Sequence, residues 1–180
     1  MNASKTLLLS CAASLAAPLF GAQTEAVLGR LIGQTSLSSI VQSAAPNLVE
    51  GRELNSPQGA ALDLSATPPI LYVSDTGNNR VLGWRDASSF VNAAPADIVI
   101  GQKDLLSTWG NGPGTSIPKG LFAPTGLLVD SHGNLYVMDA GNNRILRFPQ
   151  PFEQADALKL PDQVIGQPDY NTRTVNTGGI

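Results

Sequence analysis

The tetrapeptide Gly-Asn-Asn-Arg occurs twice in this chain of 180 residues, and its side chains are well suited to recognising a polar ligand. Asparagine carboxamides both donate and accept hydrogen bonds, and an arginine guanidinium adds a planar donor group that is always charged. Grouped in one turn, they could bind a glycan or a peptide. The candidate contact residues are Asn78, Asn79, Arg80, Asn142, Asn143 and Arg144.

An aspartate before each tetrapeptide supports a structural interpretation of the same turn. Asp75 precedes Arg80, and Asp139 precedes Arg144, by the same short spacing. A carboxylate at this position accepts N–H groups of the turn, and an arginine that begins the next strand can pair with a nearby carboxylate or carbonyl. The sequence favours this role for the aspartate and arginine, which leaves the asparagines as the better ligand candidates.

The tetrapeptide is the centre of a longer repeat. The pattern Leu-Tyr-Val-x-Asp-x-Gly-Asn-Asn-Arg begins at Leu71 and again at Leu135, an offset of 64 residues. Val-Ile-Gly-Gln follows both copies, at residues 99–102 and 164–167, and a further Ile-Gly-Gln stands at residues 32–34. A fixed period of this length indicates a repeat architecture.

Each repeat predicts four short strands, because brief apolar runs alternate with turns rich in aspartate, asparagine and glycine. The expected strands are residues 59–62, 70–74, 80–84 and 96–101 in the first unit, and 126–129, 135–138, 144–148 and 163–166 in the second. Their apolar runs indicate sheets buried on both faces. The expected fold is therefore all-β, with about two four-stranded antiparallel blades of a partial β-propeller.

Both units resemble an NHL repeat. The second matches throughout, from Pro124 to Phe148: Pro-x-Gly, an apolar strand ending in aspartate, Gly-Asn-Leu-Tyr-Val, then Asp-x-Gly-Asn-Asn-Arg and an aromatic residue. The first departs just before Leu71, where Pro68, Pro69 and Ile70 replace the usual turn residues. The chain also resembles exported bacterial NHL proteins with long spacers. The resemblance implies a propeller, from a family whose members bind proteins, RNA or small ligands, with a few enzymes among its propeller relatives.

The first 22 residues predict a secretory signal peptide. Lys5 is followed by an apolar run over residues 6–20 and then by two small residues, the arrangement of such a leader. We therefore expect a secreted or periplasmic protein with no membrane span. The only cysteine, Cys11, lies in this leader. A lipoprotein interpretation would use Cys11, but the apolar run continues past it; otherwise the exported chain has no disulfide.

Charge argues against nucleic acid as a partner. Without the leader, which carries only Lys5, ten basic residues face 14 acidic residues, so the net charge moves from −3 to −4. Nucleic acid and anionic membrane surfaces both attract basic proteins. The 18 glycines and 13 prolines agree with a turn-rich all-β domain.

The repeat boundaries divide the chain into six segments. They are the signal peptide (1–22), an N-terminal segment with a leading strand and an insert (23–56), the first blade (57–102), an insert (103–123), the second blade (124–167) and the start of a further insert (168–180). A propeller typically has four to eight blades. We therefore expect a fragment of a longer protein or, if the chain is complete, a partial propeller that self-associates.

The long inserts are expected on the same face as the tetrapeptide turns. In an antiparallel meander, the turn after the second strand and the link after the fourth lie at one end. Inserts of this length are often functional. Trp109 lies in a Gly/Pro-rich part of the second insert, where it could contact a ligand or fold back over the blade edge; the sequence favours the second arrangement.

Catalytic motifs are not apparent in the sequence. His132 is the only histidine and is expected to be a solvated turn residue, and we expect neither a metal site nor a cofactor in these two units. The leading hypothesis is a non-catalytic exported scaffold that binds a protein, a glycan or a small ligand. The alternative is part of a propeller lyase or hydrolase whose metal site lies in blades outside this sequence.

Overall fold

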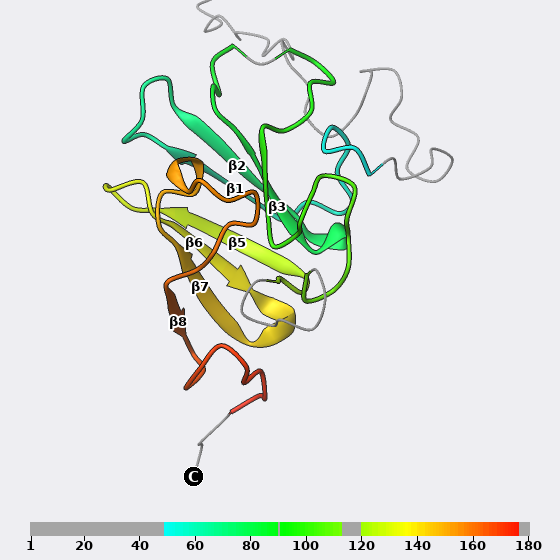
Figure 1. Cartoon of the computed structure of the whole chain (residues 1–180), viewed down its shortest axis with the longest axis vertical. Helices are drawn as coiled ribbons and strands as arrows, with labels where there is room; N and C mark the ends of the chain where they lie inside the picture. The colour runs from blue at the N-terminus through cyan, green and yellow to red at the C-terminus, as the bar shows by residue number, and fades with distance from the viewer. Residues whose placement is uncertain (1–48, 90, 113–119, 177–180) are drawn as a thin grey trace, which may run out of the picture.

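The computed structural model describes residues 49–89, 91–112 and 120–176, which form two four-stranded antiparallel sheets (Figure 1). The first contains β1 (Gly59–Asp63), β2 (Ile70–Asp75), β3 (Arg80–Trp84) and β4 (Ile98–Ile100). The second contains β5 (Pro124–Val129), β6 (Leu135–Asp139), β7 (Arg144–Phe148) and β8 (Gln163–Ile165). Each sheet follows chain order, so the expected all-β fold with two blade-like meanders is confirmed. The two described sheets do not close a ring.

The expected strands match the observed ones closely, except that β4 is shorter at both ends, β8 ends one residue earlier and β5 begins two residues earlier. The signal peptide and the early Ile-Gly-Gln lie outside the described residues. Within the described part of the chain, no helix is long and apolar enough to cross a membrane.

The tetrapeptide turns join the second and third strands of each sheet through a short 3₁₀ helix, η1 (Thr76–Asn78) or η3 (Ala140–Asn142). The residue that follows, Asn79 or Asn143, has a φ of 53° and lies in the left-handed region. Asparagine adopts this conformation more readily than most residues other than glycine. The conformation therefore explains why an asparagine suits the third position of the motif.

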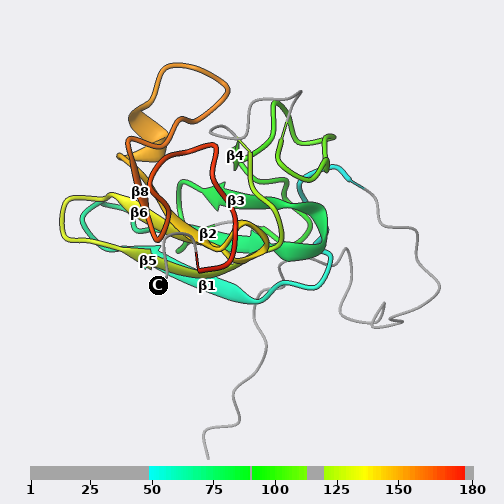
Figure 2. The same cartoon turned by 90° about the horizontal axis from the view of Figure 1, so that it is seen from below.

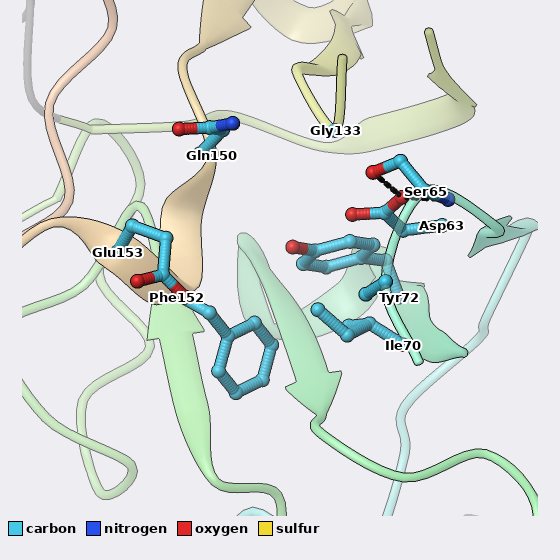
Figure 3. Close-up of a pocket in the computed structure, with 9 residues that line it drawn as sticks. Asp63, Ser65, Ile70, Tyr72, Gly133, Gln150, Phe152 and Glu153 are labelled. Atoms are coloured by element: carbon cyan, nitrogen blue, oxygen red, sulfur yellow. Dashed lines mark hydrogen bonds between the residues drawn. The ribbon is translucent and has the colours of Figure 1, made fainter. Parts of the chain in front are cut away.

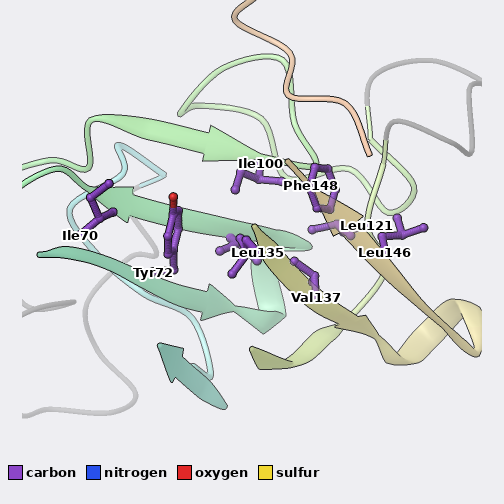
Figure 4. Close-up of a cluster of buried hydrophobic side chains, with 9 residues drawn as sticks. Ile70, Tyr72, Ile100, Leu121, Leu135, Val137, Leu146 and Phe148 are labelled. Carbon is purple, nitrogen blue, oxygen red and sulfur yellow. The ribbon is translucent and has the colours of Figure 1, made fainter. Parts of the chain in front are cut away.

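The main core lies between the two facing sheets (Figure 4). In β2, Ile70 and Tyr72 point towards the second sheet, whose strand β6 contributes Leu135 and Val137. The alternate residues of the first sheet, such as Val73, pack on its other face in a second apolar cluster. Both faces of the first sheet are therefore covered, as the continuous apolar runs predicted.

The outer face of the second sheet is more exposed, so the expected burial of both faces is wrong for this sheet. Met138 and Ile165 are 48% and 42% exposed, whereas the matching residues of the first sheet, Ser74 and Ile100, are fully buried. The difference arises because the second sheet covers this face of the first.

The two sheets approach each other most closely along β1 and β5 (Figure 2). The hydroxyl of Thr76 donates a hydrogen bond of 2.6 Å to the carbonyl of Pro124. A Cβ placed on Gly59 would lie 2.3 Å from the carbonyl oxygen of Thr125. Glycine is therefore required where the two backbones meet.

Strand direction gives the pair of sheets two distinct ends. The motif end carries η1, η3 and the loops that follow β4 and β8 (Figure 1). The hairpin end carries the β1–β2 turn, the β5–β6 turn and the β7–β8 loop, which includes the 3₁₀ helix η4 (Pro151–Glu153). The tetrapeptide turns and the loops after the fourth strands therefore share one end, as strand direction predicted.

Candidate functional site

A buried ion pair organises the first tetrapeptide turn. Arg80 Nε donates to Asp75 Oδ2 over 2.7 Å, and both side chains are fully shielded from solvent. Asn78 donates its side-chain amide to the same carboxylate oxygen, and the backbone N–H of Asn55 donates to the other. Arg80 Nη1 also donates to the carbonyl of Leu105 in the loop after β4.

The second turn repeats this arrangement. Arg144 Nε lies 2.8 Å from Asp139 Oδ2, and Asn142 and the backbone of Phe122 donate to the same carboxylate. Burial raises the pKa of Asp139, and the hydrogen bonds from Phe122, Asn142 and Arg144 act in the opposite direction. Arg144 Nη1 donates to the carbonyl of Tyr170 over 2.5 Å. Each arginine thus links the turn to the loop after the fourth strand.

Burial determines whether the side chains of the tetrapeptides can contact a ligand. Asn78, Arg80, Asn142 and Arg144 are buried, and they donate hydrogen bonds within their own chain. In this arrangement their side chains offer no surface to a ligand. The structural interpretation of the aspartate and arginine extends to the first asparagine of each motif.

The second asparagine of the first motif fastens the insert. Asn79 donates its side-chain amide to the carbonyl of Thr108 over 3.1 Å and accepts the N–H of Ala123 over 2.9 Å. Gln102, which is fully buried, donates to the carbonyls of Asn79 and Trp109 over 2.9 and 2.8 Å. The insert is thereby tied to the turn at Thr108 and Trp109 and at its last residue, Ala123.

The second unit holds its loop in the same way. The amide of Asn143 donates to the carbonyl of Arg173, and Gln167 donates to the carbonyls of Asn143 and Thr174. Sequence reasoning did not assign a role to either glutamine. The recurrence of Ile-Gly-Gln at nearly the same distance after both tetrapeptides was the signal that could have revealed it.

Exposed apolar side chains project from the first fastened loop. Trp109 is 77% exposed although Gln102 and Gly112 both donate to its backbone carbonyl. Leu106 and Phe122 are 70% and 43% exposed. Trp109 therefore takes the exposed arrangement, and the expected folding over the blade edge is not observed. We call Leu106, Trp109 and Phe122 the loop patch.

A second candidate site lies at the hairpin end, between the two sheets. It is a pocket of about 180 Å³, formed by the β1–β2 turn and β2 on one side and by the β5–β6 turn and the β7–β8 loop on the other. Asp63 and Tyr72 face Gln150, Phe152 and Glu153 across it (Figure 3).

The pocket combines acidic and aromatic groups. The rings of Tyr72 and Phe152 have centroids 6.0 Å apart. Burial, and secondarily the charge of Asp63, raise the pKa of the Tyr72 hydroxyl. Arg85 lies 4.6 Å above the Phe152 ring and 3.7 Å from Glu153.

Sequence reasoning did not predict this pocket. The feature of the sequence that could have revealed the pocket is the departure of the first unit from the repeat, because the extra residues make the β1–β2 turn longer and this turn forms part of the pocket wall. In the second unit, the matching turn closes on itself: Asp130 accepts hydrogen bonds from the backbone of His132 and from Asn134. His132 itself is exposed in this turn, as expected.

The described residues contain no group of three or more histidine, cysteine, aspartate or glutamate side chains arranged to hold a metal ion. Comparison of the sequence with protein-family profiles and with curated proteins finds no match.

Proposed function

We propose that this chain is an exported, NHL-type propeller module that binds a protein or a glycan through its loop patch and has no catalytic role. The observation that carries the proposal is the repeated fastening of the loops. In both units a buried Asp–Arg pair, an asparagine and a glutamine hold the backbone that follows the fourth strand.

These contacts hold the described parts of the first loop, residues 103–112 and 120–123, in place before any partner binds. A contact surface that is already ordered loses less conformational entropy on binding than a flexible one. Trp109 can then present a large, rigid ring at small entropic cost, and tryptophan is enriched among residues that contribute most to binding. The NHL assignment is supported by the complete motif of the second unit.

An array experiment tests this function. The labelled full chain is applied to glycan and protein arrays, and each binder is titrated against Trp109→Ala. We expect this substitution to weaken binding at least tenfold, a loss of about 1.4 kcal/mol or more, without changing the melting temperature.

The matched control is Leu64→Ala, because Leu64 is 74% exposed at the hairpin end and lies outside the loop patch. It should leave binding unchanged. The proposal fails if no binder is found, or if every binder tolerates Trp109→Ala as well as it tolerates the control.

A further inference from the structure

The pocket at the hairpin end holds a buried carboxylate that forms no ion pair among the described residues and a buried hydroxyl that has no hydrogen-bond partner among them. Asp63 is 4% exposed, and none of the ion pairs among the described residues involves it. The hydroxyl of Tyr72 is fully buried and has no hydrogen-bond partner in the described structure. Buried charges are normally paired, and an unsatisfied buried hydroxyl costs about 1–3 kcal/mol.

The two groups act on the same space because of strand register. Asp63 lies opposite Ile70, and Ala61 lies opposite Tyr72, so the side chains of Asp63 and Tyr72 are diagonal neighbours on one face of the β1–β2 pair. Both side chains project towards the second sheet (Figure 3). One oxygen of Asp63 accepts the N–H and hydroxyl of Ser65 over 2.8 and 2.6 Å, and its other oxygen lies towards Gly133.

We propose that this pocket binds a primary alkylammonium group, with Asp63 as its counter-ion and the Tyr72 hydroxyl as a hydrogen-bond acceptor. The volume of about 180 Å³ far exceeds the roughly 10–15 Å³ that a single water molecule needs in a cavity, which leaves room for a short alkylamine.

The walls favour an organic cation over a metal ion. Calcium takes six to eight oxygen ligands, whereas much of this pocket is formed by Ile70, Ala66 and the rings of Tyr72 and Phe152. Apolar and aromatic groups of this kind suit an alkyl chain, and an aromatic face attracts an ammonium ion.

The positive charge of Arg85 does not take the place of the ligand's ammonium group beside Asp63. Arg85 lies over the ring of Phe152 and pairs with Glu153, and its side chain is 59% exposed. Glu153 thus has a basic neighbour, whereas Asp63 has none among the described ion pairs. Asp63 therefore supplies the negative charge that an ammonium group would meet.

The inference is independent of the proposed function, since the pocket and the loop patch lie at opposite ends of the sheets. Binding is measured with the full chain by NMR, following the signals of the Tyr72 and Phe152 rings while n-butylammonium is added. We expect saturable shifts in these rings. The neutral isostere n-butanol should bind at least tenfold more weakly, because it cannot pair with Asp63.

Two substitutions test the assigned roles. Asp63→Asn should weaken butylammonium binding at least tenfold, since it removes the counter-ion but keeps the oxygen that accepts from Ser65. Tyr72→Phe should weaken it roughly fivefold, the effect of about one hydrogen bond. Tyr72→Phe should also leave the melting temperature unchanged or higher, because the hydroxyl has no partner within the described chain. Asp169→Asn, which changes charge equally at the motif end, should have no effect.

Nα-acetyl-lysine methylamide identifies the source of the ammonium group. If this probe binds as tightly as butylammonium, the natural ligand is the lysine side chain of a partner. If only butylammonium binds, the natural ligand is a free amine. Both results support the ammonium site. The proposal is overturned if butanol binds as tightly as butylammonium, if calcium chloride alone shifts the same rings in an Asp63-dependent way, or if no ring signal saturates at tens of millimolar amine.

Discussion

Arg80 Nε lies 2.7 Å from Asp75 Oδ2, and both side chains are completely shielded from solvent. The two residues also face each other as the register partners that close the β2–β3 hairpin. Removing two charges from water is costly, and the cost is offset only when the remaining donors and acceptors are satisfied. Asn78 and Asn55 donate to the carboxylate and Leu105 accepts from Arg80 Nη1, whereas Arg80 Nη2 is buried without a hydrogen-bond partner among the described residues. The contact with Leu105 means that the ion pair and the loop after β4 stabilise each other.

Asp75→Asn should lower the free energy of unfolding by about 3–5 kcal/mol, because it leaves the Arg80 charge buried without a counter-ion. Urea denaturation measures the change. The comparison is Asp162→Asn, which breaks a half-exposed pair with Arg147 and should cost about 1 kcal/mol or less. Equal losses in the two variants would contradict a structural role for the buried pair.

Asn79→Gly should destabilise the protein by about 1–2 kcal/mol more than Asn143→Gly. Both residues have a φ of 53°, which glycine adopts freely, so the comparison isolates the side-chain hydrogen bonds. Asn79 bonds both Thr108 and Ala123, whereas the amide of Asn143 bonds the exposed Arg173 segment; each bond contributes about 1 kcal/mol. Hydrogen exchange at the Ala123 amide should accelerate only in Asn79→Gly. Unchanged exchange there would refute the assigned contact.

The strands were predictable because their information is local. Short apolar runs such as residues 70–74, bounded by turn residues, define where each strand begins and ends. Strand direction then placed the turn at Asn79 and the loop containing Trp109 at the same end. The sequence also predicted that Arg80 pairs with a nearby carboxylate or carbonyl, and the structure shows that Asp75, five residues away across one hairpin turn, is the carboxylate.

Long-range contacts were not predictable. Asn79 reaches Ala123, 44 residues away, and Gln102 reaches the backbone of Asn79, 23 residues away. The pocket brings Asp63 next to a loop of the other sheet that contains Phe152. A single sequence shows that such residues recur or interrupt a repeat, but their partners depend on how the two sheets pack.

Gln102→Glu should loosen the loop after β4. The buried amide of Gln102 donates to the carbonyls of Asn79 and Trp109, and a carboxylate would place negative charge against both. We expect a loss of about 1–3 kcal/mol and faster proteolytic cleavage within residues 103–109. Gln167→Glu, at the exposed equivalent, should have a smaller effect. If both variants resist protease as the parent does, the fastening role of glutamine is refuted.

The ion pair between Arg147 and Asp162 should contribute a small, pH-dependent stabilisation. Arg147 donates to both carboxylate oxygens, over 2.8 and 2.6 Å, and these bonds hold the pKa of Asp162 below its usual value. A lowered folded pKa gives stability that is present above about pH 4, the ordinary aspartate range, and is lost as the pH falls through the folded value.

The melting temperature of Asp162→Asn should therefore be lower than that of the parent at pH 7, and the two should converge at pH 2. Asp156→Asn removes an equal charge from the same loop and serves as the control at each pH. A constant difference between Asp162→Asn and the parent across this range would show that the carboxylate charge is not responsible.

Gly59→Ala should separate the two sheets, whereas Gly126→Ala, at the equivalent repeat position, should be tolerated. A Cβ on Gly59 would meet the backbone oxygen of Thr125 at 2.3 Å, but a Cβ on Gly126 would meet only the side chain of Met138, at 3.7 Å or more. Neither glycine has a positive φ, so the difference is steric.

Because a backbone atom cannot rotate away, Gly59→Ala must move β1 from β5 and should cost about 1–3 kcal/mol. Gly126→Ala should change stability by about 0.5 kcal/mol or less, or raise it slightly by restricting the unfolded chain. Urea denaturation gives both values, and NMR contacts between residues 59 and 125 report directly on the contact between β1 and β5. Equal stability of the two variants, with those contacts intact, would mean that β1 and β5 do not meet as closely as the structure shows.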